Sequence, residues 1–128
     1  MTLVHEDPDH LSKVVIGMAI EVHKELGAGL LESNYEECLC LELDLQKIRF
    51  RGQPPVPVFY KGKKLRARFR PDIMVASQLI IEIKCVEKLA PIHTAQVLTY
   101  LKHTGLHVGL LFNFNSEVLI NGMKRIVR

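Results

Sequence analysis

The chain has 128 residues, of which 48% are hydrophobic and 24% charged, a composition typical of one globular domain spanning 1–128 and not of a disordered segment. No apolar run approaches the ~20 residues that cross a bilayer, and the acidic N-terminus lacks the features of a signal peptide. Cys38, Cys40 and Cys85 have no disulfide or zinc spacing. We therefore expect a cytoplasmic protein with buried free thiols and no membrane association.

Two helices are expected at the start of the chain. Asp7-Pro8-Asp9 is typical of a helix N-terminus, and apolar residues then recur at helical spacing until Gly27, which predicts a helix over 9–26. A second helix is predicted over 31–48. Its expected buried face consists of Leu31, Tyr35, Cys38, Leu41, Leu45 and Ile48.

Strands dominate the next part of the chain. Alternating patterns predict strands at 56–60 and 65–69 around the turn 61–63, then at 72–76 and 79–86 around a turn at 77–78. A helix is predicted over 91–104, followed by an apolar strand over 107–114 and a short final hairpin with a turn at 121–122. A helix between strands favours a partly parallel sheet. The fold class is therefore α/β, with a mixed β-sheet of about five strands flanked by helices.

A positively charged segment follows the second helix. Residues 45–71 include nine Lys or Arg and no Asp or Glu, whereas the rest of the chain has eight basic and fourteen acidic residues. This asymmetry predicts a surface that binds a polyanion. The expected nucleic-acid contacts are Lys63, Lys64, Arg66, Arg68 and Arg70. A solvated face that protects a sheet edge is the alternative interpretation.

Two carboxylates and an amine are expected to meet on neighbouring strands. Glu82 and Lys84 share a face of an otherwise apolar strand, and a hairpin would bring Asp72 close to them. Buried charges are costly unless they are paired or bind a metal. Two adjacent acids can hold a divalent cation while a lysine orients water, a combination suited to phosphodiester cleavage. The alternative is an ion pair between Glu82 and Lys84 on a solvated surface.

The predicted helix over 91–104 adds polar groups. Gln96 and Tyr100 are four residues apart and therefore share one face. This face would add an amide and a phenol to whatever it covers. Ordinary helix packing with a tyrosine at its rim is the alternative.

Taken together, these elements resemble the PD-(D/E)xK nuclease superfamily, which has a restriction-endonuclease-like fold. Asp72 with Glu82-x-Lys84 is similar to the motif that names the superfamily, and Gln96-x-x-x-Tyr100 resembles the QxxxY element of its RecB-like branch. Gly29-Leu30-Leu31-Glu32-Ser33-Asn34-Tyr35 matches the signature of the GxxExxY proteins of the same superfamily. The resemblance extends from Ser12 to Phe114 and implies a restriction-endonuclease-like core.

The resemblance also implies roles for individual residues. Glu32, Asp72 and Glu82 would hold Mg²⁺ or Mn²⁺, and Lys84 would position or activate the attacking water. Gln96 and Tyr100 would orient Lys84 or contact the phosphate backbone, which completes the expected catalytic set. Glu32 has an alternative role as a carboxylate that favours a helix N-terminus. RecB-like enzymes often use a helical histidine as a metal ligand; a lone helical histidine such as His23 is more often structural, and we leave it outside the site.

The expected function is metal-dependent hydrolysis of nucleic acid, with DNA favoured over RNA. The alternative is a non-cleaving nucleic-acid-binding module, or an interaction subunit, that retains the nuclease fold. Because 128 residues accommodate little beyond a catalytic core, sequence specificity would need a homodimer or a partner protein.

Overall fold

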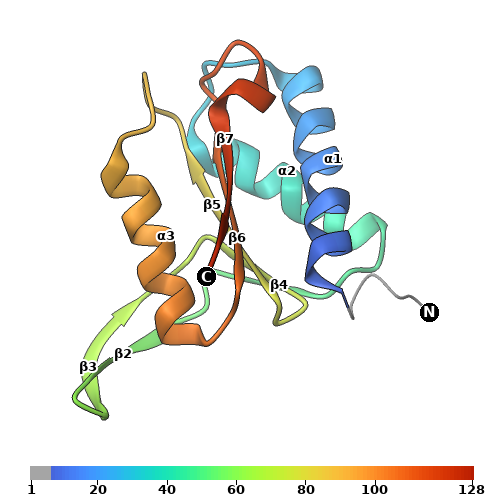
Figure 1. The fold of residues 1–128 in the computed structure, drawn as a ribbon. Coiled ribbons are helices and arrows are strands. Elements are labelled where there is room, and N and C mark those ends of the chain that lie inside the picture. The colour runs from blue at the N-terminus through green and yellow to red at the C-terminus, as the bar shows by residue number, and fades with distance from the viewer. Residues whose placement is uncertain (1–6) are drawn as a thin grey trace.

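The computed structural model describes residues 7–128 (Figure 1). Its helices are α1 (Pro8–Leu26), α2 (Glu32–Leu45) and α3 (Pro91–Thr104), and a 3-10 helix, η2, spans Leu119–Gly122. The strands are β1 (Phe50–Gly52), β2 (Val56–Tyr60), β3 (Lys63–Phe69), β4 (Ile73–Val75), β5 (Leu79–Lys84), β6 (Val108–Asn113) and β7 (Met123–Val127). No helix within the described part is long and apolar enough to cross a membrane.

The strands form a five-stranded mixed sheet and a separate hairpin. The sheet has the order β1-β4-β5-β6-β7, in which only β5 and β6 are parallel, while β2 pairs with β3 alone. The helix α3 connects the two parallel strands, as crossover connections require. The predicted α/β fold with a mixed sheet of about five strands flanked by helices is therefore confirmed.

The sheet separates two hydrophobic cores. Helices α1 and α2 cover one face and α3 covers the other (Figure 1). Strand β5 contributes to both, since Ile81 and Ile83 face α1 and α2 whereas Ile80 packs with Val97 and Leu101 of α3. Side chains two apart on a strand share a face. Glu82 and Lys84 therefore lie on the α3 side of the sheet.

The α3 layer packs closely on the sheet because β6 contains a glycine. A Cβ atom at Gly109 would lie 2.5 Å from Cγ1 of Val97, a distance that would force α3 away from the strand. The glycine thus keeps α3, and the polar residues on it, close to β5.

The buried face of α2 differs from the predicted one. Tyr35, Leu39 and Leu43 are fully buried, whereas Leu41 and Leu45 are exposed. Six of the eight residues in the segment 38–45 are apolar, so more than one helical face is apolar and the spacing does not decide between them. The helix also ends at Leu45 rather than at 48.

Both sheet edges also differ from the prediction. The short strand β1, which pairs with β4 as an edge strand, was not predicted. The tail forms η2 and then β7, which pairs with β6 instead of folding as a hairpin of its own.

The turn between β4 and β5 is made by Ala76 and Ser77, both with positive φ, and not by 77–78. The three cysteines are free, as expected, but only half-buried.

Candidate active site

Asp72 and Glu82 meet across the antiparallel pair β4–β5. Ile73 lies opposite Ile81, so the register places Asp72 opposite Glu82. The Asp72 backbone N–H donates to Oε1 of Glu82 at 2.7 Å, and the Ile83 N–H donates to Oδ2 of Asp72, also at 2.7 Å. Each carboxylate is thus held by a backbone group of the opposite segment. The sequence prediction that a hairpin unites these two acids is confirmed.

Burial and the closeness of the two carboxylates make it unfavourable for both to be ionised. Glu82 is buried, with a relative exposure of 4%. Burial, followed by the charge of Asp72, raises the pKa of Glu82 to about 8. Burial also raises the pKa of Asp72, against the hydrogen bond from Ile83 and the positive charge of Lys84. The pair therefore favours either a shared proton or a bound cation at neutral pH.

Lys84 lies at the end of β5, on the same face as Glu82, and is half-buried. Its positive charge lowers the pKa of both Asp72 and Glu82. It is close enough to act on them, yet it forms no ion pair within 4.0 Å, because the one ion pair found among residues 7–128 joins Arg125 and Asp9. The surface ion pair that was the alternative interpretation is therefore absent from the described residues.

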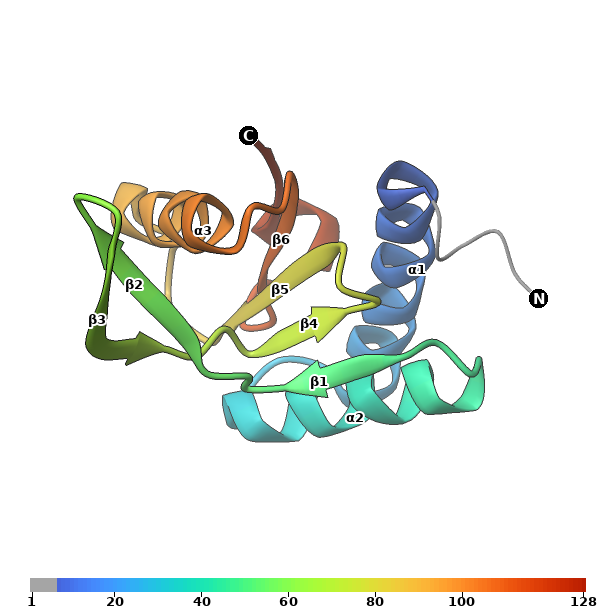
Figure 2. The same ribbon diagram turned by 90° about the horizontal axis from the view of Figure 1, so that it is seen from below.

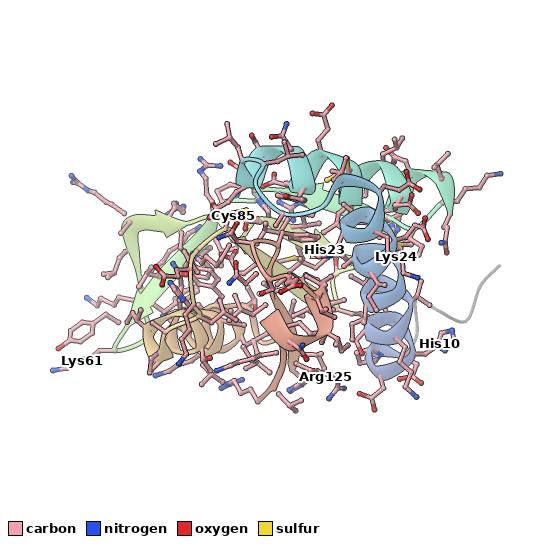
Figure 3. All side chains as sticks on the ribbon, turned by 90° about the horizontal axis from the view of Figure 1, so that it is seen from above. His10, His23, Lys24, Lys61, Cys85 and Arg125 are labelled. Carbon is pink, nitrogen blue, oxygen red and sulfur yellow. The ribbon has the colours of Figure 1, made fainter. Side chains whose placement is uncertain are left out.

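Glu32 lies in the first turn of α2, beside the residue that follows β5. Its Oε2 accepts a hydrogen bond of 3.0 Å from the Cys85 N–H, and Cys85 is labelled in Figure 3. The charge of Glu32 raises the pKa of both Asp72 and Glu82. Glu32 is thus held near the site by the backbone immediately after β5.

Tyr35 stabilises the loop that precedes Glu32. Its ring is fully buried and stacks on Phe114 with centroids 4.4 Å apart. Its hydroxyl donates to the Gly27 carbonyl and accepts from the Leu30 N–H. These bonds fix the loop between α1 and α2, from which the helix bearing Glu32 begins.

Glu36, which was not among the predicted site residues, also belongs to this group of acids. Glu36 lies one helical turn after Glu32 and accepts a 3.3 Å hydrogen bond from Nε2 of Gln53. Burial, followed by the charge of Asp72, raises its pKa. Its spacing from Glu32 was a usable signal, since residues four apart on a helix share a face.

Gln96 and Tyr100 lie on α3, and Tyr100 connects the site with the hairpin. Burial raises the pKa of Tyr100 to about 12, with further contributions from the charges of Glu82 and Asp72, while the Gln96 side chain opposes the rise. The ring of Tyr100 stacks on Phe69 at 4.4 Å and 4°. Tyr100 is thus near enough to the carboxylates to respond to their charges, whereas no contact of Gln96 with them is found among the described residues.

The hairpin of β2 and β3 carries the predicted basic contacts. In Figure 2 it projects beside α3, away from α1 and α2. The five predicted contacts are exposed: Lys63, Lys64, Arg66, Arg68 and Arg70. Two of them are partly engaged, because Arg68 donates to carbonyls of its own strand and Arg70 donates to the Gln53 carbonyl at 3.2 Å.

Asn113 is a buried polar residue that sequence reasoning missed. It lies opposite Lys84 in the parallel register, with a relative exposure of 2%. Its amide donates to the Val86 carbonyl at 2.9 Å and accepts from the Val86 N–H at 3.1 Å. Asn113 thereby fixes the chain immediately after Lys84. The signal was an asparagine ending an otherwise apolar strand.

His23 has a structural role. Its Nε2 lies 2.8 Å from the Ser116 carbonyl oxygen, and its ring faces Phe114. It therefore ties α1 to the segment after β6, consistent with its omission from the predicted site.

Two of the three predicted metal ligands, Asp72 and Glu82, have oxygen atoms suited to a hard divalent cation. Carboxylate oxygens are the ligands that Mg²⁺ and Mn²⁺ prefer, and Oδ1 of Asp72 and Oε2 of Glu82 accept no hydrogen bond from residues 7–128. However, no group of three or more His, Cys, Asp or Glu side chains is arranged to hold a metal within this range. Asp72 and Glu82 fit a metal, and Glu32 is turned to Cys85 instead.

Comparison with known proteins agrees with this geometry. A family model of the PD-(D/E)XK nuclease superfamily matches residues 9–126. No curated protein and no solved structure matches the chain. Nucleases of this superfamily usually use divalent metals and act on nucleic acid.

Proposed function

Since the chain belongs to the PD-(D/E)XK nuclease superfamily, we propose that it is a divalent-metal-dependent nuclease that cleaves phosphodiester bonds, of DNA in preference to RNA. The observation that carries this proposal is the pair of buried Glu82 and half-buried Asp72, which is held by two backbone hydrogen bonds. The Gly29-x-x-Glu32-x-x-Tyr35 sequence supports placing the chain with the GxxExxY proteins.

The carboxylates would hold the metal through their free oxygens, Oδ1 of Asp72 and Oε2 of Glu82. Glu32 would join them after releasing the Cys85 N–H. When bound, Mg²⁺ or Mn²⁺ would supply a Lewis acid that polarises the phosphate and lowers the pKa of water. The pKa of Glu82, about 8 in the metal-free protein, means that cation binding releases a proton at neutral pH.

Lys84 would orient the attacking water and stabilise charge on the scissile phosphate. It has no ion-pair partner within 4.0 Å among the described residues, so its amine is available to a substrate. Tyr100, kept protonated by a pKa of about 12, would donate a hydrogen bond to a phosphate oxygen. Gln96 would hold that phenol in place.

The hairpin would supply affinity. Its exposed cations lie on the segment that leads directly into Asp72, since β3 ends three residues earlier at Phe69. Phosphate contacts of this kind provide affinity with little sequence discrimination. A homodimer or a partner protein would then supply specificity.

A nuclease assay tests the proposal. The parent protein and the Glu82→Gln variant are incubated with single- and double-stranded DNA and RNA in Mg²⁺, Mn²⁺ or EDTA. Cleavage should require the metal and disappear in the variant. Glu21→Gln, which changes an exposed acid of α1 on the opposite face of the sheet, is the matched control and should cleave like the parent.

The alternative function makes a different prediction in the same assay. No cleavage by the parent, combined with salt-dependent binding of the oligonucleotides, would support a non-cleaving nucleic-acid-binding module. The engagement of Glu32 by Cys85 favours this alternative, because it leaves the metal ligands incomplete. Absence of binding as well would support an interaction subunit.

A further inference from the structure

The tip of the hairpin exposes aromatic side chains that the fold does not use. Phe59 is 45% exposed and Tyr60 is 62% exposed, and the neighbouring Leu65 is 39% exposed. The hairpin forms a sheet of its own, and Lys61, labelled in Figure 3, marks its far end. Side chains this exposed contribute little to stability, because apolar stabilisation scales with the area removed from water.

Each exposed ring lies beside a cation. Phe59 is opposite Lys64 and Tyr60 is opposite Lys63 in the hairpin register, and directly opposite residues share a face. Phe59 and Tyr60 are adjacent, so their rings point to opposite faces of the hairpin. At the tip, Nζ of Lys61 lies 5.5 Å from the centroid of the Tyr60 ring. Both faces thus combine an aromatic surface with a positive charge.

The charge of the segment identifies the occupant of this surface. Residues 45–71 contain nine basic and no acidic residues. An uncharged protein partner would bury these cations without compensation, which is costly. A polyanion with flat apolar groups would satisfy both features, and nucleic acid has them in its phosphates and bases.

From this arrangement we propose that Phe59 and Tyr60 each offer a stacking surface for unpaired bases, one on each face of the hairpin tip, and that the substrate contains single-stranded nucleic acid. The proposal rests on the nuclease function proposed above and specifies its substrate class. In a duplex the base faces are covered by neighbouring bases, so the hairpin could use only its cations there. In a single strand the faces are open, and aromatic side chains bind them whatever the base.

The connection to the active site supports this substrate class. Phe69, on the same strand as Lys63, stacks on Tyr100, and the charges of Glu82 and Asp72 affect the Tyr100 phenol. The next residues after β3 lead to Asp72 itself. A strand held at the hairpin tip would therefore continue along β3 toward the carboxylates.

The test compares binding of a labelled single-stranded DNA, its duplex and an RNA of the same sequence, all in Ca²⁺ without cleavage. Tyr60→Ala should weaken binding of the single strands roughly tenfold, while duplex affinity changes less than about twofold. Tyr60→Phe keeps the ring and should bind like the parent. Lys63→Ala, the charge control on the same face, should weaken single-strand and duplex binding alike.

Two outcomes would overturn the proposal: equal single-strand affinity in Tyr60→Ala and the parent, or an equal loss for the duplex. Circular dichroism of Tyr60→Ala confirms that the variant is folded. The DNA and RNA arms decide which unpaired strand the surface prefers. Absence of cleavage in Mg²⁺ and Mn²⁺ would overturn the nuclease function alone, because this binding assay requires no cleavage.

Discussion

The rings of Phe69 and Tyr100 lie parallel, with centroids 4.4 Å apart and an angle of 4° between their planes. Phe69 is the last residue of β3, and Tyr100 belongs to α3. The stack therefore joins the basic hairpin to the helix that covers Glu82. This contact therefore couples the position of the hairpin to the geometry of the site. His103 of α3 adds to it, because its ring lies beside Phe69 and its Nδ1 accepts a 3.3 Å hydrogen bond from the Phe59 N–H.

A double-mutant cycle measures that coupling. Phe69→Ala and Tyr100→Ala should each lower the free energy of unfolding, and their combined effect should be smaller than the sum by about 0.5–1.5 kcal/mol, the usual strength of an aromatic pair. Urea unfolding provides the values. Phe59→Ala, which removes an exposed ring of the same hairpin, should be additive with Tyr100→Ala. Additivity of the Phe69 pair as well would show that the stack contributes nothing.

The stability of the metal-free protein should fall as the pH rises from about 4.5 to about 8. Burial and the charge of Asp72 raise the pKa of Glu82 from 4.5 to about 8. Within this window the folded protein keeps a proton that the unfolded chain releases, so a rise in pH favours unfolding. Urea unfolding in EDTA at several pH values measures the slope.

Glu82→Gln is the matched variant for this pH dependence. The amide keeps the shape and one acceptor oxygen but does not titrate, so its stability should vary less with pH across the window. An identical slope in the variant and the parent would assign the pH dependence to other groups. Mn²⁺ should stabilise the parent more at the upper end of the window, because the metal binds the deprotonated pair.

Calorimetry with Mn²⁺ should separate the contributions of the three predicted metal ligands. Asp72→Asn and Glu82→Gln should each abolish Mn²⁺ binding, since the register of β4 and β5 places the two residues opposite each other. Glu32→Gln should weaken binding less, because its carboxylate is exposed and already accepts a bond from Cys85. Unchanged affinity in the Asp72 and Glu82 variants would exclude the site.

Much of this arrangement follows from sequence alone, for a definite physical reason. Asp72 and Glu82 belong to strands joined by a tight turn, so local register decides their meeting. Gln96 and Tyr100 share a helix face because of helical periodicity. Such short-range rules also indicated α1, α3 and the strands of the hairpin. Local geometry therefore brings Asp72 to Glu82 and places Gln96 beside Tyr100, whereas the position of Glu32 depends on a distant contact.

The features that sequence did not reveal depend on distant contacts. Strand β1 exists because it pairs with β4, and β7 because it pairs with β6. The buried face of α2 is chosen by the sheet beneath it, among several apolar faces of the helix. The bond of Glu32 to Cys85 spans 53 residues of sequence, and that of Asn113 to Val86 spans 27. Periodicity contains no information about such partners.

Loss of the Asn113 amide should destabilise the protein and slow cleavage. Asn113→Leu would leave the Val86 N–H without its partner and the Val86 carbonyl with only the 3.4 Å bond from Asn115. A buried group left unpaired costs about 1–3 kcal/mol. The segment after Lys84 would then lose its fixed position, so single-turnover cleavage should fall. Asn115→Ala is the control, since Asn115 gives only a 3.4 Å bond to the same carbonyl. Equal stability of the two variants would contradict a positioning role for Asn113.

Replacement of Lys84 distinguishes a role in the chemical step from simple charge balance. The Lys84 charge lowers the pKa of Asp72 and Glu82, and arginine would keep that effect. Arginine, however, is a planar fork that does not deprotonate at working pH, whereas lysine is a compact point charge on a flexible stem. Lys84→Arg should therefore bind nucleic acid nearly as well as the parent in Ca²⁺ but lose most cleavage.

Lys84→Met completes the comparison because it removes the charge and keeps a flexible chain of similar length. It should fold, since Lys84 has no ion-pair partner within 4.0 Å among the described residues, and it should not cleave. Single-turnover cleavage at saturating protein, measured beside binding of the same oligonucleotide, separates affinity from chemistry. If Lys84 orients water, the larger and planar guanidinium of arginine should not replace it. Cleavage by Lys84→Arg at the parent rate would therefore show that Lys84 acts only as an electrostatic partner of the carboxylates.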